Sequence, residues 1–133
     1  MNPQTTAILI KTFNRPHRLL PTVASIREYC KEPFRLYIGD DGEVTPEVAQ
    51  LYAGLMAEGH IIKRYESRLN VTTARNDLVR MLGDEAFVLR LDDDFNFSAE
   101  TRLDAMLAIM RQRPEIGALS GLERQLGDGK KIR

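Results

Sequence analysis

The 133-residue sequence has a single cysteine, no excess of either charge and no apolar run longer than a strand. Because Cys30 has no partner for an intrachain disulfide, the fold requires no oxidising compartment. Nineteen basic residues balance nineteen acidic residues, which argues against a broad surface for nucleic acid or anionic membrane. No segment reaches the length of a membrane span, and the N-terminus lacks the pattern of a secretion signal. We therefore expect a cytoplasmic protein with no transmembrane segment and no nucleic-acid partner.

The composition is that of an ordinary globular domain, with 43% apolar and 29% charged residues. A chain of this length can bury a core without disulfides and is too short for two domains of ordinary size. We expect one domain over residues 1–122, followed by a polar tail over residues 123–133.

Strand-like and helix-like segments alternate along the chain. Short apolar runs predict five strands, which are Thr6–Lys11, Phe34–Ile38, Ile61–Tyr65, Ala86–Leu91 and Ile116–Ser120. Helix-start signals lie between them, at Pro16 with Asn14 as a cap, at Pro46 with Thr45 as a cap, at Thr72 or Thr73, and at Ser98. Alternation of this kind predicts a Rossmann-like three-layer α/β/α fold with a mostly parallel sheet.

Polar segments follow three of the predicted strands, namely Thr12–Arg15, Asp40–Asp41 and Asp92–Asp94. In parallel sheets, ligands bind beyond the carboxyl ends of the strands. These three segments are therefore the candidate functional residues.

The three adjacent aspartates, Asp92, Asp93 and Asp94, are the strongest of these signals. Their mutual repulsion brings no benefit to folding. Side chains alternate along extended backbone, so Asp92 and Asp94 are expected to point the same way and Asp93 the other way. Two carboxylates on one side suit Mg²⁺ or Mn²⁺, which often uses one or two carboxylates together with substrate phosphates. The structural alternative is a solvated acidic turn that caps a helix.

The other two strand ends can recognise a nucleotide. A buried Asp40 or Asp41 could accept a hydrogen bond from the N–H of a base such as uracil, although Asp-Asp-Gly is also a common turn. Thr12, Phe13 and Arg15 offer a hydroxyl, an aromatic ring and a guanidinium, which can stack on a base and hold a phosphate. The alternative is that Phe13 belongs to the core and Arg15 is solvated.

Arg75 lies in the first turn of a predicted helix, where the helix dipole favours acidic residues. A phosphate of a ligand nearby would explain a cation at this point. An exposed arginine without a ligand is the alternative.

Together these residues resemble the nucleotide-binding half of glycosyltransferases of the GT-A fold, family 2 group, over roughly Thr6–Leu122. The resemblance rests on the order of four segments, which are Thr12–Pro16 (TFNRP), Asp40–Gly42 (DDG), Asn70–Asn76 (NVTTARN) and Asp92–Asp94 (DDD).

A narrower likeness, to β-1,4-N-acetylgalactosaminyltransferases, indicates a UDP-N-acetylhexosamine donor. It rests on Lys11–Phe13, Ala74–Asn76, Asp92–Phe95, Phe97 and Thr101–Leu103.

The resemblance implies a role for each candidate residue. Thr12, Phe13 and Arg15 would surround the uridine, and Asp41 or Asp40 would meet the uracil ring. Arg75 would lie near the base or the diphosphate, and Asp93 would contact the ribose or the sugar. Asp92 and Asp94 would form the D-x-D motif that holds Mn²⁺ or Mg²⁺ on the diphosphate.

One departure from the family concerns the catalytic base. GT-A relatives usually have a second half, which binds the hydroxyl acceptor (a glycan, lipid or protein) and supplies the base of inverting members. No acidic residue of Glu123–Arg133 matches that base. We therefore expect an inverting, metal-dependent reaction that needs a partner domain or a second copy of the chain.

Two other functions stay open on the residues alone. The chain could be a non-catalytic module that binds nucleotide sugars, or a phosphotransfer enzyme with a nucleophile among Asp92–Asp94. A nucleotidyltransferase would carry a glycine-rich loop after the first strand, and residues 12–16 contain no glycine.

Overall fold

The computed structural model describes residues 5–121, 123–124 and 131–132, and it divides the chain into two compact units, Met1–Thr101 and Arg102–Arg133. The first unit contains β1 (Thr6–Thr12), α1 (Pro16–Tyr29), β2 (Phe34–Asp40), α2 (Pro46–Ala57), β3 (Ile61–Arg64), α3 (Val71–Arg80) and β4 (Phe87–Asp92). The second contains α4 (Leu103–Gln112) and the short antiparallel pair β5 (Glu123–Arg124) and β6 (Lys131–Ile132). The predicted tail over residues 123–133 lies mostly outside the described residues.

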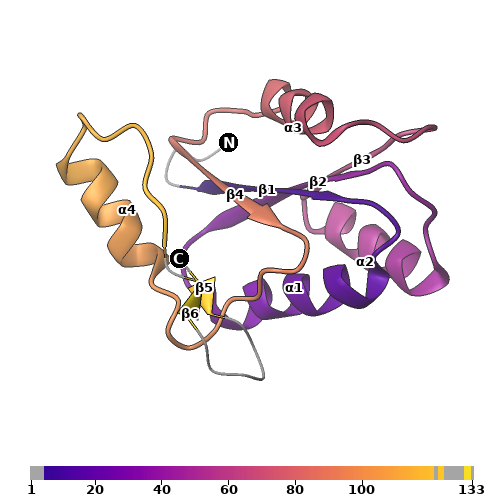
Figure 1. Cartoon of the computed structure of the whole chain (residues 1–133), viewed down its shortest axis with the longest axis horizontal. Helices are drawn as coiled ribbons and strands as arrows, with labels where there is room; N and C mark the ends of the chain where they lie inside the picture. The colour runs from indigo at the N-terminus through magenta and orange to yellow at the C-terminus, as the bar shows by residue number, and fades with distance from the viewer. Residues whose placement is uncertain (1–4, 122, 125–130, 133) are drawn as a thin grey trace. The chain divides into compact units, whose positions relative to one another are not determined.

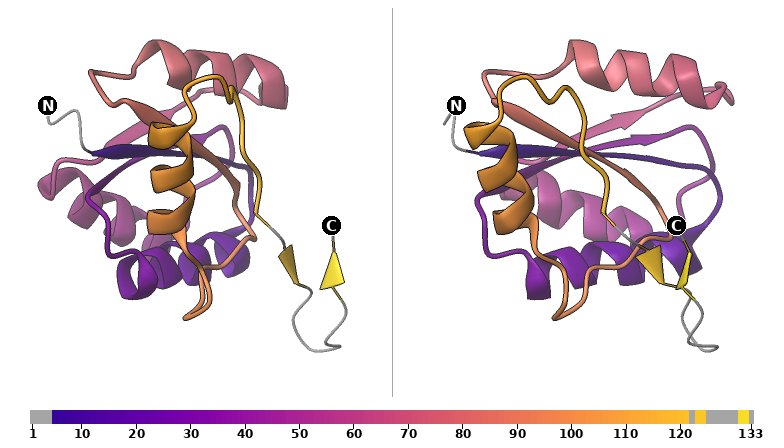
Figure 2. Two further views of the ribbon diagram at one scale, coloured as in Figure 1. Left: turned by 90° about the vertical axis from the view of Figure 1, so that its left-hand side faces the viewer. Right: turned by 60° about the vertical axis from the view of Figure 1, so that its left-hand side comes forward.

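The first unit is a four-stranded sheet in the order β3-β2-β1-β4, and every pair of neighbours is parallel. Helices α1 and α2 cover one face of the sheet, and α3 covers the other (Figures 1 and 2). The predicted three-layer α/β/α fold is confirmed.

Apolar side chains on both faces of the two central strands form the core. The face toward α1 and α2 carries Ile8, Ile10, Leu36, Ile38 and Leu91. The face toward α3 carries Ala7, Leu9 and Tyr37, which pack with Leu78. Because β1 and β2 are buried on both faces at their centres, consecutive residues there are apolar, Ala7–Ile10 in β1 and Leu36–Ile38 in β2.

The strand order places a switch point between β1 and β4. The chain moves from β1 to β2 and β3 on one side, and it then returns through α3 to place β4 on the other side of β1. Such points open a crevice at the carboxyl ends of the strands, where α/β proteins bind ligands. Thr12 and Asp92, the last residues of β1 and β4, lie at this switch point.

Two of the predicted helix caps are wrong. Helix α1 begins at Pro16, but Asn14 does not cap it; Asn14 has a φ of 52° and accepts a hydrogen bond from the amide of Glu43. Helix α3 is capped by Asn70, which accepts from the amide of Thr73, so neither threonine of the pair is the cap. A side chain that finds a partner in another loop is lost to its own helix, and sequence spacing does not reveal this.

The start of α2 is confirmed. Pro46 occupies its first turn, and the Thr45 side chain accepts a hydrogen bond from the Val48 amide.

The predicted strand Ile116–Ser120 and the start of the last helix are wrong. Residues 116–120 are irregular, and all of them except Ile116 are exposed. A strand needs a neighbouring ladder for its backbone, and no described segment provides one here. Helix α4 begins at Leu103 rather than Ser98, because Ser98 and Thr101 close a turn through two mutual hydrogen bonds.

In the part of the chain that the structure describes, none of the helices is both long and apolar enough to cross a bilayer.

His60, the residue before β3, bonds to β2 through a contact that requires the neutral imidazole. Its Nδ1 accepts a hydrogen bond from the Leu36 amide at 3.0 Å, and its ring stacks on Phe34 with 5.6 Å between centroids. Burial lowers the pKa of His60 below the ordinary histidine value. A histidine with a lowered pKa stabilises the fold at pH values above its unfolded-state pKa, and this contribution is lost as the pH falls through the folded-state pKa.

We therefore expect the free energy of unfolding to decrease between about pH 7.5 and about pH 5.5, a range around the ordinary histidine pKa of about 6.5. The variant His60→Asn can still accept the Leu36 N–H but does not titrate, so it should lose less stability over this range. Urea unfolding of both proteins at the two pH values measures the difference. Equal losses would show that His60 is not the titrating group.

Candidate functional site

A cleft of about 640 Å³ opens at the carboxyl edge of β1, β2 and β3. It is lined by Phe13, Asn14, Asp41, Gly42, Glu43 and residues 64–68. These residues directly follow the three strands or end them, so the sheet topology alone brings them together.

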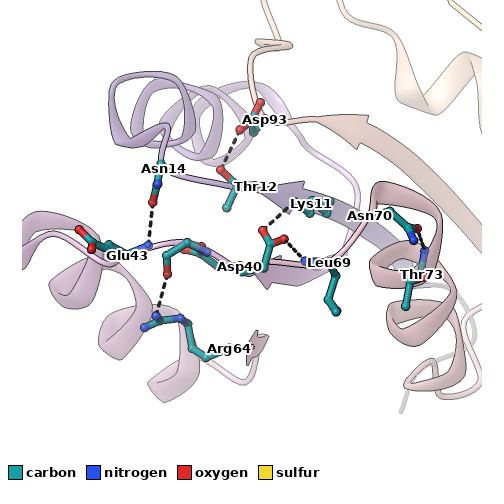
Figure 3. A network of polar contacts seen from close by, with 12 residues as sticks. Lys11, Thr12, Asn14, Asp40, Glu43, Arg64, Leu69, Asn70, Thr73 and Asp93 are labelled. Atoms are coloured by element: carbon teal, nitrogen blue, oxygen red, sulfur yellow. Dashed lines mark hydrogen bonds and ion pairs between the residues drawn. The ribbon is translucent and has the colours of Figure 1, made fainter. Parts of the chain in front are cut away.

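The acidic segment Asp92–Asp94 begins at the last residue of β4, and its three side chains have different surroundings. Asp93 is buried, and its Oδ2 accepts a hydrogen bond from Thr12 Oγ1 at 2.7 Å (Figure 3). The side chains of Asp92 and Asp94 are 49% and 30% exposed. The Thr12–Asp93 bond therefore ties β4 to β1 and leaves the other two carboxylates at the surface.

Two arginines lie against these carboxylates. Arg15 contacts Asp93 at 3.2 Å and Asp94 at 3.1 Å, and Arg75 in α3 contacts Asp92 at 2.7 Å. Six of the predicted site residues thus form a cluster of two adjoining groups: Arg75 with Asp92, and Thr12 and Arg15 with Asp93 and Asp94. Asp94 shares Arg15 with Asp93, whereas Asp92 turns to α3, so the expectation that Asp92 and Asp94 point the same way is wrong; the extended backbone ends at Asp92. The three carboxylates exceed the two guanidinium groups by one negative charge, and a cation can supply the balance.

Asp40 and Asp41 are both buried but point to different neighbours. Asp40 accepts hydrogen bonds from the Gly42 amide at 2.9 Å and from the Tyr52 hydroxyl of α2 at 2.6 Å. Burial and the bond to Asp40 raise the pKa of Tyr52, so this hydroxyl stays a donor. Asp40 is therefore part of the packing between β2 and α2, and Asp41 is the one of the pair that lines the cleft.

Asp41 is held by two donors. Its Oδ1 lies 2.6 Å from Lys11 Nζ, and its Oδ2 accepts from the Leu69 amide at 2.6 Å. Burial alone would raise the pKa of Asp41. The Lys11 ammonium and the Leu69 amide together outweigh this effect, so the pKa lies below its usual range. Asp41 is thus an ionised acceptor beneath the cleft.

Phe13 lies in the cleft wall and not in the core, which decides against the structural alternative considered for it. The guanidinium of Arg68 lies 4.2 Å from its ring centroid, and Lys11 Nζ lies 5.5 Å from the same centroid. Both distances are within the range of cation–π contacts.

Sequence reasoning missed the contributions of Lys11, Asn14 and residues 64–68 to the cleft. The signal for residues 64–68 was the position of the third strand, since its carboxyl end meets the same sheet edge as Asp41. Asn14 accepts from the Glu43 amide at 2.7 Å (Figure 3). Arg64 donates to the Gly42 carbonyl at 3.0 Å, so both side chains hold the loop after β2.

Gly42 is required by a close approach between two loops. A Cβ atom at this position would lie 2.3 Å from Asn14 Oδ1 and 2.7 Å from the Asn14 backbone nitrogen. The loop after β1 therefore packs directly on the loop after β2.

Asp92 and Asp94 are the residues of the site that could hold a divalent cation. They are exposed carboxylates, the donor type that Mg²⁺ and Mn²⁺ prefer. Across the described residues, no group of three or more His, Cys, Asp or Glu side chains could hold a metal ion. A metal held by Asp92 and Asp94 would therefore need further ligands from another source, such as phosphate oxygens or water.

Comparison with known proteins relates this geometry to one family. The sequence pattern of glycosyl transferase family 2 matches residues 7–133. The chain is also similar to the β-1,4 N-acetylgalactosaminyltransferase 2 of Mus musculus, with 27% identity over 118 residues. The match covers 86% of this chain and 20% of the mouse protein, so the chain spans about a fifth of that relative.

Solved structures of S. aureus TarS share the fold. One TarS structure superposes with a TM-score of 0.71 at 15% identity, and it covers 97% of this chain and 23% of TarS. The structure of TarS 1–349 in complex with UDP-GlcNAc superposes with a TM-score of 0.66 at 17% identity, covering 83% of this chain and 32% of that one.

The packing of the two loops yields a test by Gly42→Ala. The added Cβ must displace the Asn14 backbone, so we expect a loss of about 1–3 kcal/mol in the free energy of unfolding. The matched control is Gly54→Ala in α2, where a Cβ meets nothing within 4 Å. The free energy of unfolding of the control should increase by about 0.5–1 kcal/mol, because alanine favours the helix more than glycine does. Urea unfolding measures both, and a Gly42→Ala protein as stable as the wild type would contradict the contact.

Proposed function

The chain belongs to glycosyl transferase family 2, and we propose that it forms the donor-binding part of a glycosyltransferase. The reaction would move a sugar from a UDP-sugar to a hydroxyl acceptor. The observation that carries this proposal is the cluster of Asp92–Asp94 with Arg15 and Arg75, at the switch point beside the cleft. It combines cationic groups for phosphates with carboxylates for a metal.

The uridine would lie in the cleft. The ring of Phe13 offers a stacking surface, and the ionised carboxylate of Asp41 can accept a ring N–H. The structure supports Asp41 rather than Asp40 for this contact, because Asp40 is occupied by Tyr52. Thr12 would act indirectly, because its hydroxyl holds the Asp93 carboxylate in place.

The diphosphate would lie over the cluster. Guanidinium groups form charge-assisted, often bidentate hydrogen bonds to phosphate oxygens, and Arg15 and Arg75 would exchange their carboxylate partners for these oxygens. Asp92 and Asp94 would hold Mn²⁺ or Mg²⁺, which as a Lewis acid neutralises the negative charge that develops on the departing UDP. Asp93 stays a predicted contact of the ribose or the sugar.

An N-acetylhexosamine is the donor sugar that the relatives support. The mouse relative is a β-1,4 N-acetylgalactosaminyltransferase, and a structurally similar TarS fragment was solved with UDP-GlcNAc. The acceptor would be a hydroxyl of a glycan, lipid or protein. We propose a cytoplasmic location on the basis of the unpaired Cys30.

The inverting reaction would also need a base, and we propose that a partner domain or a second copy of the chain supplies it. A module that binds nucleotide sugars without catalysis is the second candidate, since Asp41 and Asp92–Asp94 are all paired with basic residues of the chain. Transfer of radiolabelled N-acetylhexosamine to a hydroxyl acceptor distinguishes the two. The family assignment argues against the phosphotransfer enzyme.

The variant Asp94→Ala tests the metal-binding part of the proposal. We expect UDP to bind the wild type more tightly with Mn²⁺ than with EDTA, and we expect the variant to lose this difference while it stays folded. Calorimetric titration measures both affinities, and circular dichroism checks the fold. The matched control is Asp104→Ala, because Asp104 is also an exposed acid that pairs with an arginine. A variant whose UDP binding still responds to EDTA would contradict the assignment.

The variant Arg75→Ala tests contact with the phosphates. A lost charge-assisted hydrogen bond of about 1.5–3 kcal/mol corresponds to roughly 10- to 100-fold weaker UDP binding. Uridine has no phosphate, so its affinity should change little. Arg80→Ala, at the other end of α3, removes the same charge and should affect neither ligand. Equal weakening of UDP and uridine by Arg75→Ala would place Arg75 away from the phosphates.

A further inference from the structure

The segment Glu66–Leu69 contacts Phe13 and Asp41, the two residues that we propose bind the base of the nucleotide. The Leu69 amide donates to Asp41 Oδ2 at 2.6 Å, and the Arg68 guanidinium lies 4.2 Å from the Phe13 ring centroid. With these contacts in place, the Asp41 side chain is 0% exposed. A ligand N–H therefore cannot reach this carboxylate until the segment moves.

The two contacts are those that a pyrimidine base would make in the same place. Uracil offers a flat π face for stacking and a ring N–H for a carboxylate. The planar guanidinium of Arg68 takes the stacking position on Phe13, and the Leu69 amide takes the N–H position on Asp41. Protein and nucleotide thus present the same chemistry to the same two partners.

We propose that, while no nucleotide is bound, Arg68 and the Leu69 amide occupy the positions that the base would take on Phe13 and Asp41. Arg68 thereby lowers the affinity of the site for the base. This inference rests on the proposed function. An entering base displaces Arg68 from Phe13 and the Leu69 amide from Asp41. The free energy needed to break these two contacts reduces the free energy gained when the nucleotide binds.

The surroundings allow this exchange. Residues 66–68 are exposed, and the segment is anchored at its two ends, where the Tyr65 hydroxyl donates to Asp77 and Asn70 caps α3. Movement between these anchors leaves α3 in place. Lys11 remains on the other oxygen of Asp41 at 2.6 Å, so the carboxylate stays ionised and ready to accept a base N–H.

The test compares the full chain with Arg68→Ala in calorimetric titrations with UDP and with uridine. Removal of the stacked guanidinium should tighten binding of both ligands by about two- to fivefold, the range expected for one exposed cation–π contact. The matched control, Arg80→Ala, removes the same charge at the far end of α3. In parallel, the Leu69 amide resonance is followed by NMR, and it should move upfield when UDP saturates the protein because the bond to the carboxylate is broken.

Each outcome is decisive. Equal tightening of UDP and uridine, with movement of the Leu69 resonance, supports the inference. Weaker binding of UDP alone would make Arg68 a phosphate ligand, and unchanged binding of both ligands would make it a bystander; either result overturns the inference and leaves the proposed function standing. If neither the wild type nor Arg68→Ala binds UDP, the proposed function falls and this inference falls with it.

Discussion

The parallel pairing of β1 with both β2 and β4 is the constraint on which the site depends. The register sets Thr12 opposite Asp40 on one side and Lys11 opposite Asp92 on the other. Chemistry from segments about 30 and 80 residues apart is thereby brought to one edge, and the hydrogen bond from Thr12 to Asp93 holds the turn after β4 against β1. The cost of ordering these polar ends is met by the apolar core beneath them, since β1 and β2 are buried on both faces.

The aspartates of the site all have partners within the chain when no ligand is bound, although their negative charges are not fully balanced. Asp41, Asp92, Asp93 and Asp94 each pair with a lysine or an arginine, and no buried side-chain nitrogen or oxygen of the described residues lacks a hydrogen bond. An unpaired buried charge is costly, so the buried carboxylates of Asp41 and Asp93 depend on these partners in the ligand-free chain. The proposed nucleotide would therefore have to exchange partners with the protein, and its affinity would depend on the difference between the two sets of contacts.

Sequence reasoning succeeded where local signals and packing agree. The apolar runs of the first four strands are confirmed, as are Pro16 in the first turn of α1 and the Thr45 cap of α2. It failed where a side chain has a choice of partners. Asn14 serves the loop after β2 instead of its own helix, and the apolar residues 116–120 find no ladder among the described segments. Such choices depend on which loop lies nearby in space, which local propensity does not encode.

By itself, the sequence determined the type of fold, the order of its strands along the chain and the residue types available at three strand ends. These follow from the period of apolar residues and from the turn and cap residues between them. The tertiary structure decided which carboxylate faces which partner. It turned Asp40 toward Tyr52 and left Asp41 beneath the cleft, and it laid Arg68 on Phe13. The reason is physical: a side chain's partner is set by distance in three dimensions, and spacing along the chain cannot specify that distance between loops.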